Sequence, residues 1–207
     1  MRAPFPSSVA RVARAAALVA LAVTLAPRPI AAQVVTQTVK QPAAQPAVDN
    51  AAALRKSYLG QLEELQGKFL QLAEAFPADK YAWRPAPGVR SVGEAFMHVA
   101  SEYYAWSPRS FGAAPSPVVT MTREGFQQFE ANATKENVLK HLKEGYTYGR
   151  QAVEGVDPAT LVGTKKFFGT DATTADIALG MSGDLHEHLG QLVAYARMNG
   201  IKPPWTK

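Results

Sequence analysis

Asp184 and His188 are the residues whose types and spacing most directly indicate metal chemistry. They lie four residues apart in the segment Ser182–Pro204, and in an α-helix such residues project from the same face. A carboxylate and an imidazole on one face can hold a divalent metal if a third ligand arrives from another helix. His98 is the candidate for that position. His186 falls roughly 200° around the helix from Asp184, so it is not expected at the same site.

The helix that carries both residues is predicted to begin at Thr173 or Thr174, whose side chains suit an N-cap, and to end at Asn199. Gly200 is the residue type that most often follows a helix, and the two prolines beyond it prevent the helix from resuming. The C-terminal segment is therefore expected to be one long amphipathic helix.

His98 is expected on the second of four helices. Ser91 and Glu94 match the S-x-x-E capping box, which predicts that this helix starts at Ser91. Its inward face would carry His98, Glu102 and Trp106. Taken alone, His98 is more simply interpreted as a buried neutral imidazole that has one hydrogen-bond partner.

An apolar stripe at intervals of three and four residues predicts the first helix. Asp49 or Asn50 would cap its start, and Pro77 would end it. The stripe consists of Leu54, Tyr58, Leu62, Leu65, Phe69, Leu72 and Phe76. This helix is predicted to be scaffold.

The second half of the chain adds a third helix from Thr134, and its His141 is expected on the solvated surface. Residues 108–132 are predicted to be irregular with a short helical turn near Glu124–Phe129, and a short extended pair is expected around Lys165. Four long amphipathic helices and little strand signal predict an all-α four-helix bundle.

A secretory signal peptide is predicted at residues 1–32. Its basic start, an apolar run over residues 15–26 and the small residues up to Ala32 follow the order typical of such a leader. The run is shorter than the ~20 residues of a spanning helix, although a retained signal anchor is the alternative. The protein is thus expected to be periplasmic or secreted, with a disordered linker at 33–48 and one domain at 49–207.

Charge and cysteine content exclude several classes of function. The whole chain has a formal net charge of +5, and the predicted leader holds four arginines and no acid, which leaves +1 for the rest. No basic field therefore indicates nucleic-acid binding. The chain contains no cysteine, so disulfides, a thiol nucleophile and cysteine metal ligands are excluded, and nitrogen and oxygen atoms must hold any metal.

Two motifs together resemble the DinB family of four-helix bundles, which is grouped with YfiT-like metalloenzymes. The first is WRPAPGVRSVGEAFMHVA at residues 83–100, and the second is DLHEHLGQLVAYARMNGIKPP at residues 184–204. The resemblance extends over about residues 52–205. It implies a divalent ion, often nickel or zinc, bound by one histidine on the second helix and two on the last.

Carried over residue by residue, the first ligand matches His98 and the last matches His188, whereas the middle position is Asp184. The resemblance therefore implies a two-histidine, one-carboxylate set, which suits zinc, nickel, manganese or iron. The alternative is a degenerate site whose polar side chains only hydrogen-bond one another.

Glu102 and Gln191 are the candidate catalytic residues around this set. Glu102, or alternatively Glu94 or Tyr103, would shuttle a proton, and Gln191 would orient a bound water. Similar proteins are described as thiol transferases, hydrolases or isomerases. The sequence thus predicts an exported metal-dependent hydrolase or transferase for a small molecule, without a stable membrane anchor after cleavage. The alternatives are a non-catalytic binding protein and an assembly role as a homodimer, to which Trp205 would contribute.

Overall fold

The computed structural model describes residues 47–206. The predicted signal peptide and all but the last two residues of the predicted linker lie outside this part of the chain. The α-helices are α1 (Ala47–Ala75), α2 (Val92–Ser110), α3 (Arg123–Glu130), α4 (Lys135–Glu154) and α5 (Thr174–Met198). The remaining elements are two short 3-10 helices (Ala78–Lys80 and Pro158–Leu161) and the strands β1 (Thr164–Phe167) and β2 (Thr170–Thr173).

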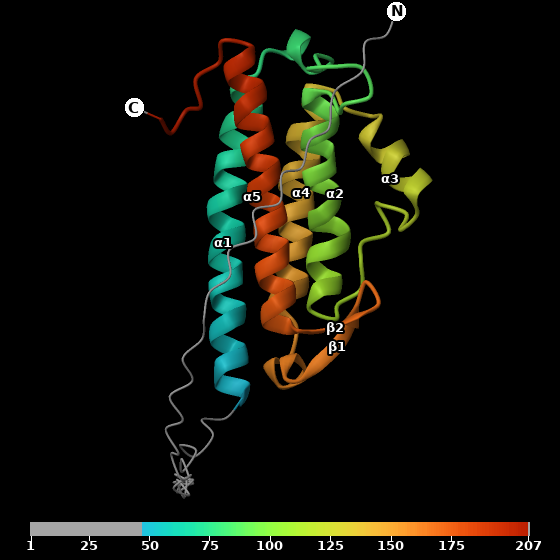
Figure 1. Ribbon diagram of the computed structural model, residues 1–207, viewed down its shortest axis with the longest axis vertical. Helices are drawn as coiled ribbons and strands as arrows, with labels where there is room; N and C mark the ends of the chain where they lie inside the picture. The colour runs from blue at the N-terminus through green and yellow to red at the C-terminus, as the bar shows by residue number, and fades with distance from the viewer. Residues whose placement is uncertain (1–46, 207) are drawn as a thin grey trace, which may run out of the picture. The chain divides into compact units, whose positions relative to one another are not determined.

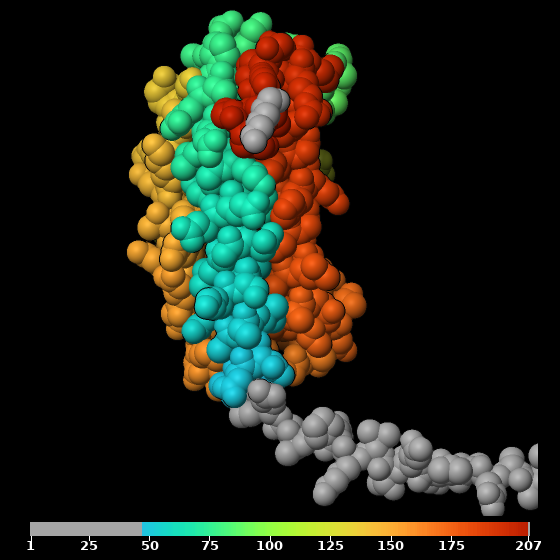
Figure 2. All heavy atoms as spheres, turned by 90° about the vertical axis from the view of Figure 1, so that its left-hand side faces the viewer, coloured from blue at the N-terminus to red at the C-terminus, as the bar shows by residue number. Residues whose placement is uncertain are grey.

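The four long helices α1, α2, α4 and α5 lie side by side and surround one apolar core (Figure 1). Helix α2 packs on α4 and α5, and α1 packs on the same two helices from the other side. Figure 2 shows α1 at the surface between α4 and α5. The short helix α3 packs on α2. None of the helices in the described region is long and apolar enough to cross a membrane.

The apolar stripe predicted for α1 faces the core. Its members from Tyr58 to Phe76 are almost fully buried, while Leu54 at the start of the stripe is partly exposed. The helix begins at Ala47, so the expectation that Asp49 or Asn50 caps its first turn is wrong. It ends before Pro77, as predicted.

Helix α2 confirms one local prediction and corrects another. Ser91 and Glu94 form the capping box, in which the Ser91 backbone N–H donates to Glu94 Oε2 at 2.7 Å. The predicted break at Pro108 is wrong, because the helix continues to Ser110. Proline has no N–H to donate to the carbonyl of Tyr104, and that carbonyl accepts a hydrogen bond from the Ser116 backbone at 2.8 Å instead.

Two glycines bring α4 close to α2. A Cβ atom at Gly149 would lie 2.6 Å from the carbonyl oxygen of Tyr103, and one at Gly145 would lie 3.0 Å from that of Ala100. These distances are too short for an alanine without a shift of the backbone. The close approach fixes the helix whose opposite face carries His98.

The chain between α4 and α5 forms the hairpin β1–β2, with Thr164 opposite Thr173 in an antiparallel register. The extended pair predicted around Lys165 is thus confirmed. Helix α5 starts at a capping box formed by Thr173 and Asp176, and it ends before Gly200, which has a φ of +71°. Both ends match the sequence-based prediction to within a residue.

Candidate metal centre

Three side chains from α2 and α5 converge at one point in the interior. Glu102 Oε1 lies 3.3 Å from His98 Nε2 and 3.3 Å from His188 Nε2. The three ligand atoms all lie within 4.8 Å of one another. Glu102 is 2 % exposed, whereas the two histidine side chains are 19 % and 15 % exposed, so the group is open to solvent only on the histidine side.

The ring of His98 is oriented by a carboxylate from α3. His98 Nδ1 lies 2.6 Å from Glu130 Oε1, and Glu130 is held in turn by two parallel hydrogen bonds from the Arg90 guanidinium, at 2.8 and 3.1 Å. Because a carboxylate accepts only, Nδ1 carries the proton and donates it to Glu130. The Nε2 atom is therefore left facing Glu102.

The ring of His188 is oriented in the same way by side chains of its own helix. Its Nδ1 lies 3.3 Å from Gln191 Oε1, and Gln191 Nε2 donates to the Tyr195 hydroxyl at 2.8 Å. The Tyr195 hydroxyl donates to the backbone carbonyl of Arg90 at 3.3 Å. This chain fixes the amide of Gln191 as an acceptor towards His188, and both histidines thus present Nε2 to the same point.

The electrostatics of the metal-free group follow from burial and pairing. Burial opposes ionisation of Glu102, but its contacts with His188 and His98 lower its pKa to about 2. Burial also disfavours the charged form of His98, yet the contacts with Glu102 and Glu130 raise its pKa to about 9. The pKa of His188 is likewise raised by Glu102 against the effect of burial. Without a metal, the Glu102 carboxylate is ionised, and its charge favours the protonated form of both histidines.

The residues present fit a divalent metal. Glu102 Oε2 is buried and has no hydrogen-bond partner among the described residues, so the carboxylate has unused acceptor capacity. Ligand atoms about 2.0–2.1 Å from a tetrahedral metal are about 3.3 Å apart, and this is the separation of Glu102 Oε1 from each Nε2. Two imidazoles whose second nitrogens are hydrogen-bonded to other groups form the arrangement that oriented metal ligands usually have.

Asp184, the third ligand predicted from the sequence, lies at the edge of this group. Its Oδ1 is 3.8 Å from His188 Nε2, and its side chain is 46 % exposed. Burial and the charge of Glu102 raise the pKa of Asp184 to about 6. Its role as a ligand stays a prediction, and the buried carboxylate that lies between the two histidines is Glu102.

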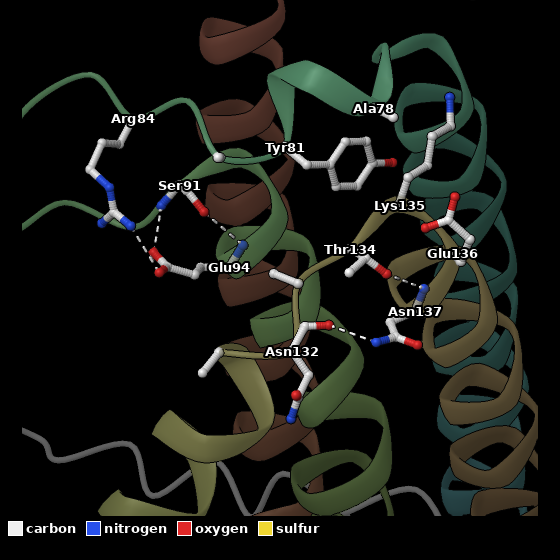
Figure 3. Close-up of a pocket in the computed structure, with 13 residues that line it drawn as sticks. Ala78, Tyr81, Arg84, Ser91, Glu94, Asn132, Thr134, Lys135, Glu136 and Asn137 are labelled. Atoms are coloured by element: carbon white, nitrogen blue, oxygen red, sulfur yellow. Dashed lines mark hydrogen bonds and ion pairs between the residues drawn. The ribbon is translucent and has the colours of Figure 1, made fainter.

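The two alternatives to Glu102 as a proton shuttle, Glu94 and Tyr103, make no hydrogen bond or ion pair with His98 or His188 in the part of the chain that the structure describes. Glu94 bonds to Ser91 and to Arg84, and Figure 3 shows all three at one side of a cavity of about 510 Å³ that the first turns of α2 and α4 enclose. Glu94 is therefore engaged in the cap of α2. Tyr103 packs against Tyr146 on α4, and its buried hydroxyl has no partner among residues 47–206.

The other two histidines lie outside the group. His186 is exposed, with Nδ1 2.7 Å from the Ser182 carbonyl oxygen of its own helix, as the helical spacing predicted. The prediction that His141 is solvated is wrong, since its side chain is only 18 % exposed and packs against the rings of Tyr104 and Phe129. The aromatic residues of α2 and α3 cover the face of α4 that carries it.

Glu130 is the site residue that the sequence analysis missed. It lies in the stretch predicted to be irregular, and it contacts His98 across 32 residues of sequence. A local signal was available: Arg123, Phe126, Gln127 and Glu130 follow the helical spacing i, i+3, i+4 and i+7. That pattern predicts that Glu130 shares a helix face with Phe126.

Two cavities flank the group. One of about 740 Å³ lies between α2 and α3 and reaches His98 and Gln191. The other, of about 370 Å³, lies between the β1–β2 hairpin and α5, is mainly apolar, and reaches Asp184. A small molecule in the larger cavity would contact His98, and one in the smaller cavity would contact Asp184.

The fold and the site together define a helical protein with a histidine and carboxylate group that can hold a metal ion. The chain belongs to the DinB superfamily, whose family model matches residues 61–192. A crystal structure of a DinB-like protein from Bacillus subtilis, YjoA, is similar in fold, with a TM-score of 0.52 and 18 % sequence identity over 70 % of this chain and 93 % of that chain. No curated protein matches the sequence.

Proposed function

We propose that this protein is a divalent-metal-dependent enzyme, a hydrolase or a transferase, that acts on a small molecule and uses a four-helix bundle of the DinB type as its scaffold. The observation that carries the proposal is the position of Glu102 Oε1, 3.3 Å from the Nε2 atoms of both His98 and His188. Zinc, nickel, manganese and iron all suit this set of nitrogen and oxygen donors. The predicted leader at residues 1–32 supports an exported protein.

The side chains of the site have separate roles in this proposal. A divalent ion held by His98, His188 and Glu102 would supply Lewis-acid chemistry, which lowers the pKa of a bound water or activates a substrate heteroatom. Glu130 and Gln191 hold the Nδ1 protons and keep both Nε2 atoms directed at the site. Glu102 is thus proposed as a ligand instead of a proton shuttle.

Two roles fit Asp184. It is the metal ligand expected from the sequence, or it accepts a proton from the attacking group, since its pKa of about 6 and its half-exposed position suit a general base near neutral pH. Asp184→Asn separates them. Loss of activity with unchanged metal affinity assigns the base, and loss of both assigns the ligand.

The test of the enzyme proposal is a screen of the metal-loaded protein against ester, amide and phosphoester substrates and against electrophiles with a low-molecular-weight thiol. Any turnover must disappear on chelation, return with metal, and be absent from His188→Ala. His186→Ala is the matched control, because His186 is an exposed histidine of the same helix. Turnover that survives both chelation and His188→Ala would contradict the proposal.

The second candidate is a non-catalytic binding protein with a degenerate metal site. The ionised Glu102 already pairs with both histidines without a metal, and this favours such a reading. Asp184→His restores the three-histidine pattern of the family and provides the test. If that variant binds metal that the natural chain does not, the natural site is degenerate.

A further inference from the structure

The cavity of about 740 Å³ beside His98 has a composition that indicates what it binds. Its volume lies within the range typical of small-molecule sites. Helix α3 forms one wall with the side chains that recur at i, i+3, i+4 and i+7, namely Arg123, Phe126, Gln127 and Glu130. Because α3 is amphipathic and packs on α2, these four side chains face the cavity together.

The charges in this cavity do not cancel. Glu130 is the only acidic residue among its lining side chains, and both Arg90 and His98 already bind it. Arg123 is exposed and has no ion pair within residues 47–206. An arginine that is free of carboxylate partners offers two parallel N–H donors to a planar anion.

The apolar part of the lining is aromatic. The rings of Trp106 and Phe126 are nearly parallel, at 4°, with centroids 6.1 Å apart. Trp106 is held on other sides by Phe168, at 4.9 Å, and by the Arg109 guanidinium, at 5.5 Å. The Trp106 and Phe126 rings therefore form an aromatic, apolar wall next to Arg123.

We infer that this cavity binds a small molecule that carries a carboxylate on a flat aromatic or conjugated ring. Arg123 binds the carboxylate, and Trp106 and Phe126 contact the ring, so that the rest of the molecule lies beside His98. This inference rests on the proposed function, since it names the class of substrate for that site.

The test uses 2-naphthoate as the probe, with 2-naphthamide as its neutral equivalent and acetate as the carboxylate without a ring. Binding is followed by the NMR signal of the Trp106 indole N–H in isotopically labelled protein, once in the presence of chelator and once with zinc. The expected order is 2-naphthoate tightest, 2-naphthamide about tenfold weaker, and acetate weaker still, because a charge-assisted hydrogen bond contributes about one order of magnitude.

Two variants of equal charge locate the interaction. Arg123→Gln is expected to weaken 2-naphthoate about tenfold and to leave 2-naphthamide unchanged. Arg109→Gln removes the same charge beside the same indole but outside the cavity lining, and it is expected to keep the preference for the carboxylate. Circular dichroism of both variants confirms that each is folded.

The outcomes separate this inference from the proposed function. A carboxylate preference that depends on Arg123 in the chelator-treated protein supports the cavity assignment even if no metal binds. Equal affinity for 2-naphthoate and 2-naphthamide overturns the inference, and so does equal loss in Arg123→Gln and Arg109→Gln. Binding of 2-naphthoate that requires zinc and survives Arg123→Gln also overturns it, because the metal then binds the carboxylate, while the metal-site proposal stands.

Discussion

Substitution of Glu102 by glutamine tests the electrostatics of the metal-free site. Glutamine has nearly the same shape, so the change removes the negative charge that lies 3.3 Å from both histidines without opening a cavity. The pKa of His98 rises from 6.5 to about 9, and each pKa unit corresponds to about 1.36 kcal/mol. This is on the order of 3 kcal/mol shared between Glu102 and Glu130, so we expect Glu102→Gln to lower the free energy of unfolding by about 2 kcal/mol.

The pH dependence of that loss has a definite sign. The folded pKa of Glu102, about 2, lies below the ordinary value of 4.5, so its contribution is present above pH 4.5 and is lost as the pH falls towards 2. The folded pKa of His98, about 9, lies above 6.5, so its contribution is complete below pH 6.5 and is lost as the pH rises through 9. The difference between the natural protein and Glu102→Gln should therefore be largest between pH 4.5 and 6.5.

The assay is urea denaturation in the presence of chelator at pH 5, 7 and 10. In a thermal melt under the same conditions, a loss of about 2 kcal/mol corresponds to a melting temperature about 4–8 °C lower for a domain of this size. Glu187→Gln is the matched control, because Glu187 is an exposed carboxylate next to His188 on the same helix. A loss that is the same at pH 5 and pH 10, or equal to that of Glu187→Gln, would refute the reasoning.

Three further predictions concern the metal, the orientation of His98 and the helix packing. A metal must displace a proton from His98, whose pKa is about 9, so the apparent metal affinity should rise by at least tenfold per pH unit between pH 6.5 and 8.5. Calorimetry in two buffers measures the proton release, and an affinity that does not change with pH would contradict the prediction. Glu130→Gln should weaken metal binding about 10–100-fold, whereas Glu124→Gln, on the exposed face of the same helix, should not, as a competition titration against a chromogenic chelator would show. Gly149→Ala should destabilise the fold by about 1–3 kcal/mol, since its Cβ would lie 2.6 Å from a carbonyl oxygen of α2. Gly67→Ala, whose Cβ would have nothing within 4 Å, should stabilise the fold by about 0.5–1 kcal/mol. Shifts of the denaturation midpoint that have the same sign in both variants would contradict the packing.

The features that depend on neighbouring residues could be predicted from the sequence. The capping boxes at Ser91 and Thr173 are local patterns, and both are present. The prediction at Pro108 failed because the carbonyl that proline leaves unpaired has a partner in Ser116, beyond the helix end. The local rule could not anticipate that partner.

In the candidate site, too, local patterns could be predicted from the sequence and contacts between helices could not. Helical spacing and family resemblance indicated His98 and His188, and the structure brings them together with ring centroids 4.8 Å apart. Spacing alone could not choose between Glu102 and Asp184, because each lies four residues from one of the histidines. The choice depends on the depth of each carboxylate between α2 and α5, which is a tertiary property, and so does the contact of Glu130 with His98.

The central claim is that His98, Glu102 and His188 hold a divalent metal. The most direct measurement is elemental analysis by plasma mass spectrometry of protein purified without a histidine tag or chelator, compared with its His188→Ala and His186→Ala variants. We predict about one equivalent of a transition metal in the natural protein and in His186→Ala, and almost none in His188→Ala. Metal below a tenth of an equivalent in the natural protein after reconstitution, or equal metal in His188→Ala, would contradict the claim.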